Sequence, residues 1–99
     1  MKKALVFWFM FWGLLALAYG QNEFEKNLYV TASGDSLNYR LLRPEIEKEG
    51  EKYPLVLFLH GAGERGSDNE KQLFHGSQMW LNPLHRENYP AFVLFPQCP

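Results

Sequence analysis

The apolar residues fall into separate stretches whose spacing differs between the two halves of the chain. In the first half, residues 24–31 mix apolar and polar side chains, and residues 37–42 alternate between the two kinds. Alternation with a period of two is typical of a strand that buries one face and exposes the other. Residues 33–36, Ser-Gly-Asp-Ser, have the composition of a turn. We expect an antiparallel hairpin that ends at residues 43–44, Arg-Pro.

In the second half, residues 55–59 and 91–95 are apolar at every position. Continuous apolar strands are typical of a sheet that is covered by helices on both faces. Gly76 and Pro83 interrupt residues 67–87, so we expect only short helical pieces in this connection. A strand, a helical crossover and a second strand make a parallel pair. The sequence therefore predicts an α/β fold in which an antiparallel hairpin is followed by a parallel β-α-β unit.

The start of the chain has the organisation of a secretory signal. Two lysines precede an apolar stretch over residues 4–18, and an Ala-Tyr-Gly end supplies small residues for cleavage. The apolar stretch is shorter than the roughly 18 residues of a membrane-spanning helix. We expect a signal peptide over residues 1–20 that is cut after Gly20, and one secreted or periplasmic domain over residues 21–99. The alternative is an uncleaved anchor, which would be the chain's only contact with a membrane.

Charge and cysteine content exclude several classes of site. The sequence contains ten Lys and Arg and eleven Asp and Glu. Without the two lysines of the leader, eight basic and eleven acidic residues remain, a net charge of −3. This balance does not favour a nucleic-acid-binding surface, which needs a basic patch. The three histidines, His60, His75 and His85, lack the spacing of metal ligands, so no metal is expected. Cys98 is the single cysteine, either a small buried residue or the partner of a cysteine outside these residues.

Candidate chemistry concentrates in the segment after the third predicted strand, His-Gly-Ala-Gly-Glu-Arg-Gly at residues 60–66. Gly61, Gly63 and Gly66 have the spacing of a dinucleotide-binding fingerprint. That fingerprint should open directly into a helix, but residues 64–69 are polar and resemble a loop. It also expects an acidic residue after the next strand, where this chain has Phe-Pro-Gln, and a carboxylate at Glu64 would repel a pyrophosphate.

The other interpretation of the segment is an oxyanion loop. In acyl transfer, negative charge develops on a carbonyl oxygen, and fixed backbone N–H donors stabilise it. Glycines on both sides of Ala62 allow the chain to turn so that the Ala62 N–H points outward. In α/β-hydrolases one such donor comes from the loop after the third strand, often with a His-Gly pair, and His60-Gly61 follows the third predicted strand here.

Residues 37–99 resemble the secreted α/β-hydrolases of the feruloyl esterase, polyhydroxybutyrate depolymerase and "predicted peptidase" group, which is dienelactone-hydrolase-like. The motif that carries most of the resemblance is Tyr-Pro-Leu-Val-Leu-Phe-Leu-His-Gly-Ala-Gly-Glu-Arg-Gly-Ser-Asp-Asn at residues 53–69. Shorter matches are Tyr-Arg-Leu-Leu-Arg-Pro at 39–44 and Tyr-Pro-Ala-Phe-Val-Leu-Phe-Pro-Gln-Cys-Pro at 89–99. The resemblance implies a serine hydrolase that acts on small esters or peptides without a cofactor.

The resemblance also implies roles for individual residues. It assigns the backbone N–H of Ala62 as an oxyanion donor, with the loop shaped by a supporting set of residues. That set is His60, Gly61, Gly63 and Gly66. His60 is then a structural residue rather than the catalytic base, because the base comes last in the chain order of this fold. Arg65 and Asp68 match family positions that could hold the loop through an ion pair or caps.

The nucleophile of this fold lies in a Gly-x-Ser-x-Gly turn, followed by the acid and the histidine. None of the serines has glycines two residues away on both sides; they are Ser33, Ser36, Ser67 and Ser77. We therefore expect the N-terminal fragment of a longer hydrolase, with an incomplete sheet and no triad, which is inactive alone. The alternative outside the enzymes is a small secreted non-catalytic binding module, which would be a self-contained domain with one solvated sheet face.

Overall fold

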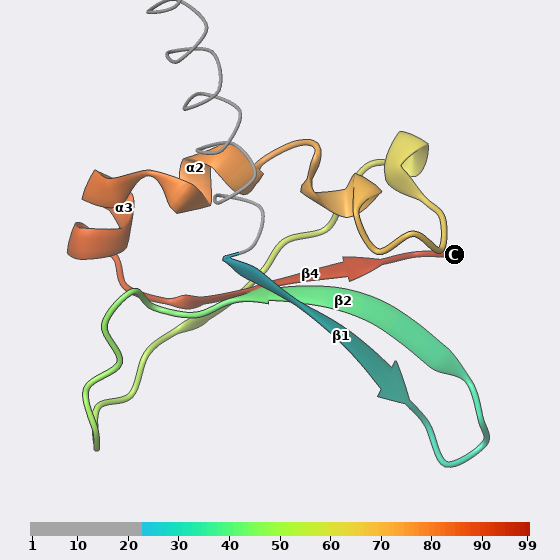
Figure 1. Ribbon diagram of the computed structural model, residues 1–99, viewed down its shortest axis with the longest axis horizontal. Helices are drawn as coiled ribbons and strands as arrows, with labels where there is room; N and C mark the ends of the chain where they lie inside the picture. Colours follow the sequence, from blue (N-terminus) through green and yellow to red (C-terminus); the bar gives the residue numbers. More distant parts are fainter. Residues whose placement is uncertain (1–22) are drawn as a thin grey trace, which may run out of the picture.

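The computed structural model describes residues 23–99, so the predicted signal peptide and its cleavage site lie outside the described residues. The chain forms one four-stranded sheet with helical segments on one side of it (Figure 1). The strands are β1 (Phe24–Val30), β2 (Ser36–Leu42), β3 (Leu55–Leu57) and β4 (Phe92–Gln97), in the spatial order β1-β2-β4-β3. The helical segments are the 3₁₀ turns η1 (Ala62–Glu64) and η2 (Lys71–Leu73) and the helices α2 (Ser77–Leu81) and α3 (Pro83–Asn88). No helix within residues 23–99 is long and apolar enough to span a membrane.

The predicted hairpin is confirmed. β1 and β2 pair antiparallel from Phe24 opposite Leu42 to Val30 opposite Ser36. At the tip, Gly34 has a φ of 93° and donates its N–H to the carbonyl of Thr31 at 3.0 Å. A positive φ is costly for any residue with a Cβ, which explains the glycine in this turn.

The predicted parallel pair is also confirmed, with β3 and β4 in register from Leu55 opposite Phe92 to Leu57 opposite Leu94. β4 also pairs antiparallel with β2, and this contact joins the hairpin to the parallel unit. The sheet is therefore mixed.

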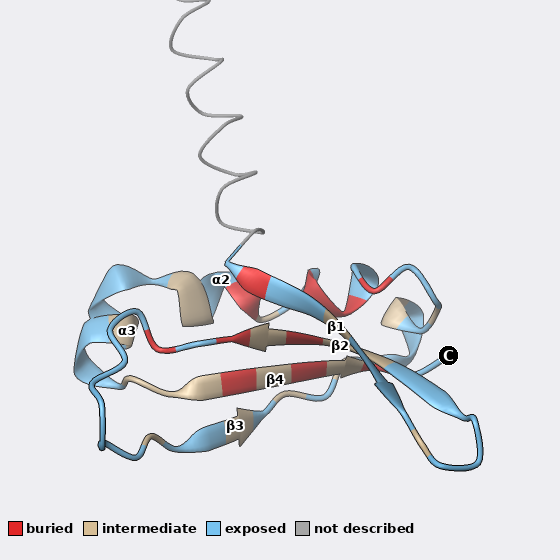
Figure 2. Ribbon diagram, turned by 60° about the horizontal axis from the view of Figure 1, so that its bottom comes forward, coloured by how far each residue is buried: buried red, intermediate tan, exposed pale blue. Residues whose placement is uncertain are grey.

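The predicted burial of the two apolar strands on both faces is wrong for the described residues. β3 is shorter than expected and lies at the edge of the sheet, where Leu55 and Leu57 are 66% and 57% exposed. Burial along β4 alternates residue by residue (Figure 2). The reason is that every helical segment of residues 23–99 lies on one side of the sheet, so the opposite apolar face has no cover from this part of the chain.

The core lies between the sheet and the helical segments. Its buried members are Phe24, Leu42, Leu73, Val93 and Phe95. Phe95 is at the centre of an aromatic group, with the ring of Phe24 edge-on at 5.2 Å and the ring of Phe58 stacked at 4.7 Å. Such arrangements add to the free energy gained by burying the rings.

The expectation that the crossover is broken into short helical pieces is confirmed. Gly76 precedes α2 in a left-handed conformation with a φ of 84°. Pro83 is the first residue of α3, where its missing N–H costs nothing. The side chain of Asn82 caps α3 by accepting a hydrogen bond from the Leu84 N–H at 3.0 Å.

Substitution of Gly76 by alanine should destabilise the fold much more than the same change at Gly50. Both glycines have a positive φ, so both variants carry the strain of a left-handed alanine, about 1 kcal/mol. A Cβ at position 50 meets no atom within 4 Å, whereas at position 76 it would lie 2.6 Å from Cε2 of Phe58 and displace that ring from Phe95. Overpacking of this kind should cost about 1–3 kcal/mol more. Urea unfolding of the full-length gene product checks this, and equal losses for the two variants would contradict the packing described here.

Candidate active-site loop

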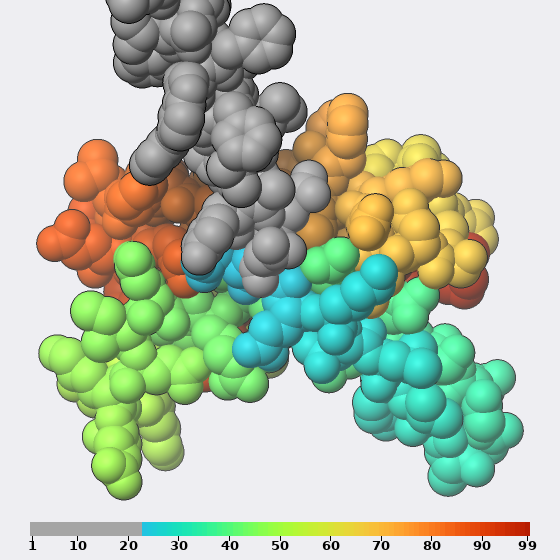
Figure 3. Space-filling model, viewed as in Figure 1, coloured from blue at the N-terminus to red at the C-terminus, as the bar shows by residue number. Residues whose placement is uncertain are grey.

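The segment after β3 leaves the sheet at the carboxyl end of the parallel pair and folds against the end of β4 (Figure 1). In the space-filling view, the yellow loop lies directly against the red C-terminal residues (Figure 3). Its first structured part is the single 3₁₀ turn η1, entered from Gly61 in an extended conformation with φ −79° and ψ 171°. The segment therefore does not open directly into a long helix, which a dinucleotide-binding fingerprint requires.

Ala62 is the first residue of η1 and is exposed. The first N–H groups of a helical turn have no acceptor within that turn. The first hydrogen bond of η1 runs from the Glu64 N–H to the Gly61 carbonyl at 3.1 Å. Among residues 23–99, no acceptor is found for the N–H of Ala62, so this donor is available to an external group.

His60 connects the loop to the end of β4. Its Nδ1 lies 2.6 Å from the Gly61 carbonyl, and its Nε2 lies 2.9 Å from the Cys98 backbone nitrogen. A carbonyl can only accept and an amide N–H can only donate. These two contacts therefore fit a neutral imidazole with its proton on Nδ1. With both ring nitrogens engaged by the backbone, His60 has no free atom to act as a base in this structure.

Two further contacts hold the loop at the same strand end. The Gly66 N–H donates to the Cys98 carbonyl at 2.9 Å, and Gly66 has a φ of 152°. Arg65 donates through Nε and Nη2 to the Pro99 carbonyl, at 3.0 and 2.8 Å. Cys98 itself is exposed, which corrects the alternative that it is a small buried residue.

Arg65 and Asp68 are not paired with each other among the described residues, where each has other partners. Asp68 accepts through Oδ1 from the backbone N–H groups of Glu70 at 3.1 Å and Lys71 at 3.3 Å. It therefore caps the entry into η2. Of the two roles considered for this position, an ion pair or a cap, the geometry shows the cap.

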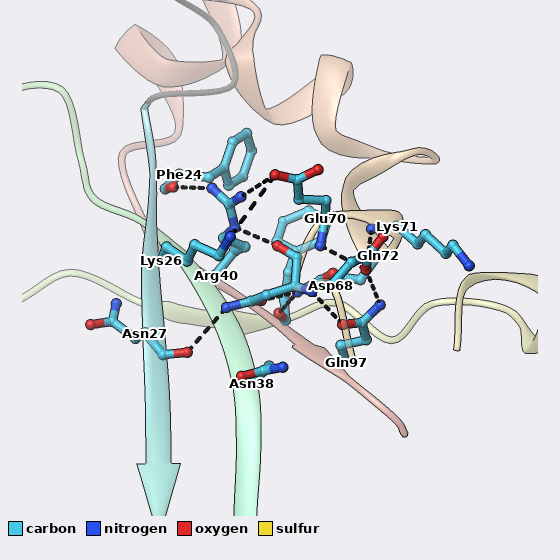
Figure 4. Close-up of polar contacts among 12 residues, drawn as sticks. Phe24, Lys26, Asn27, Asn38, Arg40, Asp68, Glu70, Lys71, Gln72 and Gln97 are labelled. Carbon is cyan, nitrogen blue, oxygen red and sulfur yellow. Dashed lines mark hydrogen bonds and ion pairs between the residues drawn. The ribbon is translucent and has the colours of Figure 1, made fainter. Parts of the chain in front are cut away.

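Beneath the loop lies a set of polar side chains that is not predicted from the sequence (Figure 4). Gln97, at the end of β4, donates through Nε2 to the Glu64 carbonyl at 3.2 Å and to Asp68 Oδ1 at 2.8 Å. Its Oε1 accepts from the Asn69 N–H at 2.7 Å. Arg40 of β2 donates from Nε to the Asn69 carbonyl at 2.7 Å. The sequence contains one signal for this set: the period of two along β2 and β4 places Arg40 and Gln97 on the same inward face as Leu42 and Phe95, which indicates buried polar side chains.

The hydrogen bond from Gln97 is the main reason why the pKa of Asp68 is lowered to about 2. The N–H of Glu70 and, more weakly, the N–H and charge of Lys71 act in the same direction. Hydrogen bonds to the ionised form favour it. Within the described residues, no group of three or more His, Cys, Asp or Glu side chains is placed to hold a metal ion.

Two hollows on the described surface bear on the position of a ligand. One of about 700 Å³ is mainly apolar and lies between the helices and the start of β3 and β4, at the opposite end of the strands from the loop. It is lined by residues that include Val56, Trp80 and Ala91. The other, of about 530 Å³, borders the loop itself at Gly63 and Glu64. Of these two hollows, the second is the one that borders the loop.

One solved structure, described as the crystal structure of a thermostable esterase, is similar to this chain with a TM-score of 0.74 and 41% sequence identity. The match covers 80% of this chain and 22% of that chain, so this chain spans about a fifth of the esterase's length. The described chain has the fold of part of an α/β-hydrolase. No family model and no curated protein matches the sequence.

The ionisation of Asp68 should make the stability of the fold depend on pH in the acid range. Because the pKa of Asp68 is lower in the folded protein than its ordinary value of 3.8, the folded state holds this proton less tightly than the unfolded state. The stabilisation is complete above about pH 4 and is lost as the pH falls toward about 2. Asp68→Asn keeps the acceptor oxygen but does not ionise.

Urea midpoints of the wild type and Asp68→Asn, measured from pH 6 to pH 2, should therefore converge as the pH falls. A constant difference across this range would show that the Asp68 carboxylate is not stabilised by the folded loop.

Proposed function

We propose that this chain is the N-terminal part of a secreted serine hydrolase of carboxylic esters, and that residues 60–66 are its oxyanion loop. The observation that carries the proposal is the N–H of Ala62. Ala62 is an exposed residue, and its N–H has no acceptor among residues 23–99. It lies beyond the carboxyl end of a parallel strand in a chain 41% identical to an esterase. In open α/β sheets, ligands bind outside the carboxyl ends of the strands.

The chemistry requires a donor that is already in position before the reaction. When a nucleophile attacks an ester, the carbonyl oxygen becomes negatively charged, and a fixed N–H stabilises that charge without reorganising. One such donor typically contributes about 3–4 kcal/mol to transition-state stabilisation. The contacts of His60, Arg65 and Gly66 supply the rigidity, because each joins the loop to residues 98–99, directly after β4.

The remaining parts of the proposal follow from the sequence. The nucleophile, the acid and the base would come from polypeptide outside these 99 residues, which contain no Gly-x-Ser-x-Gly. A small ester is the proposed substrate, with a peptide as the alternative, and no cofactor is required. The leader is proposed to direct the protein to a secreted or periplasmic location, with cleavage after Gly20.

The exposed leucines of the sheet weigh against the binding-module alternative. Such a module would present a solvated face, but Leu55 and Leu57 of β3 are 66% and 57% exposed, and Leu59 just after the strand is 70% exposed. Apolar side chains gathered on the uncovered face of a sheet are typical of a surface that another part of a larger fold covers.

Ala62→Pro in the full-length gene product tests the proposal. Proline is well tolerated at the first position of a helical turn, and the preceding residue must be extended, as Gly61 is. The substitution therefore removes the N–H with little other change. We expect kcat for a p-nitrophenyl ester to fall by about 10²–10³, the usual effect of removing one oxyanion donor.

Ala62→Gly is the matched control, because it changes the same side chain and keeps the N–H. It should retain kcat within about threefold, a loss of less than 1 kcal/mol. If Ala62→Pro folds and retains the kcat of Ala62→Gly, Ala62 is not an oxyanion donor.

A further inference from the structure

Gln97 is a polar side chain beneath the loop whose amide nitrogen and oxygen are both engaged. It is the last residue of β4 and is only 1% exposed. Both hydrogens of its amide are donated, one to the Glu64 carbonyl and one to Asp68 Oδ1, and its oxygen accepts from the Asn69 N–H. A buried carboxamide is stable in an apolar core only when its groups are paired in this way.

The three partners of Gln97 lie along the loop rather than at a single point. Glu64 is the last residue of η1, whose first residue is Ala62, and η1 is closed by its own hydrogen bond. Asp68 and Asn69 follow three and four residues after Arg65 at the end of that turn. Because the carboxamide is planar, its bonds fix the height and the tilt of η1 over the strand end. The direction of the Ala62 N–H is fixed with it.

The loop also approaches the carboxamide closely between these anchors. A Cβ at Gly66 would lie 3.5 Å from Gln97 Nε2, in ordinary van der Waals contact. Gly66 therefore lies next to the carboxamide, and its N–H donates to the Cys98 carbonyl. The hydrogen bond of Gly66 is thus a reporter of the position of the loop relative to Gln97.

Further hydrogen bonds hold Asn69, one of the partners of Gln97, against the hairpin (Figure 4). Asn69 has a left-handed φ of 55°, and its Nδ2 donates to the carbonyls of Asn27 at 3.2 Å and Tyr39 at 3.3 Å. Arg40 donates to the Asn69 carbonyl and, from Nη1, to the Phe24 carbonyl at 2.8 Å. The network therefore joins β1, β2, β4 and the loop.

We infer that Gln97 is a positioning residue of the oxyanion loop: it sets the direction of the Ala62 N–H through Glu64 and Asp68, and so acts on transition-state stabilisation rather than on substrate binding. The inference rests on the proposed function for its catalytic consequence, but the positioning itself can be measured without catalysis. Gln97 itself is buried beneath the loop and is not proposed to contact substrate.

Gln97→Glu and Gln97→Met form a pair that separates positioning from packing. Both replacements keep the approximate volume of glutamine. Methionine makes none of the three hydrogen bonds at any pH. An ionised glutamate cannot donate to the Glu64 carbonyl or to Asp68, and it places two carboxylates together, so the pair should share one proton at lower pH. Other charged groups around this position are Lys71 next to Asp68, and Arg40 next to Asn69 with its ion-pair partner Glu70.

The experiment measures kcat and KM for a p-nitrophenyl ester with the full-length gene product and both variants from pH 8 to pH 5. At pH 8, both variants should lose kcat by about 10–100-fold, the effect of a misplacement of about 1 Å, with KM changed less than about threefold. The kcat of Gln97→Glu divided by that of the wild type should rise about tenfold as the pH falls from 8 to 5. The kcat of Gln97→Met divided by that of the wild type should not change with pH. Wild-type kcat within threefold in both variants, or equal pH profiles for the two, would overturn the inference.

Amide hydrogen exchange at Gly66 supplies the readout that does not depend on catalysis. It should be at least tenfold faster in Gln97→Met than in the wild type, and unchanged exchange would overturn the inference even if the enzyme is active. A wild type that hydrolyses no ester would instead defeat the proposed function and leave the exchange result to decide the positioning. If both Gln97 variants fail to fold, Asp68→Ala replaces them, because Asp68 is exposed and the change removes one of the two acceptors of Gln97. This variant should lose less kcat than is expected for the Gln97 variants, and its amide exchange at Gly66 should be faster than in the wild type.

Discussion

The interaction on which the rest of the structure depends is the set of hydrogen bonds between the end of β4 and the loop after β3. Parallel pairing places the carboxyl ends of both strands at the same edge of the sheet. The loop then meets Gln97 at the end of β4 and the two residues that follow it. Gln97 bonds to backbone groups of Glu64 and Asn69, and the Cys98 carbonyl accepts from the Gly66 N–H. The Pro99 carbonyl accepts from the side chain of Arg65. A loop that is fixed in this way can leave the N–H of Ala62 without an acceptor among the described residues and still keep its shape.

The cost of this arrangement is a polar network inside a small core. Arg40, Asn69 and Gln97 are all buried next to Phe24 and Phe95. Burying such groups is unfavourable unless their hydrogen bonds are made, and nearly all of them are. Within the described residues, the buried side-chain atoms without a partner are Gln72 Oε1 and Trp80 Nε1. The network ties the geometry of the loop to the hairpin, because a shift in either would break several bonds together.

The sequence predicts the features that depend on local chemistry. Gly34 marks the hairpin turn, and Gly76 and Pro83 break the crossover, because each residue restricts its own backbone. The partners of Gln97 could not be predicted in the same way, since they lie 28–33 residues away and depend on how the loop folds back. The exposure of Leu55 and Leu57 was missed for a related reason: their apolar character predicts a cover that residues 23–99 do not supply.

The role of Ala62 is tested most directly by a crystal structure of the full-length gene product inhibited with a phosphonate ester, whose phosphoryl oxygen occupies the position of the charged oxygen in acyl transfer. This oxygen should lie about 2.7–3.1 Å from the backbone nitrogen of Ala62, with the loop held by Gln97. A phosphoryl oxygen bound elsewhere, with the Ala62 N–H paired to another protein group, would contradict the role of Ala62 as an oxyanion donor.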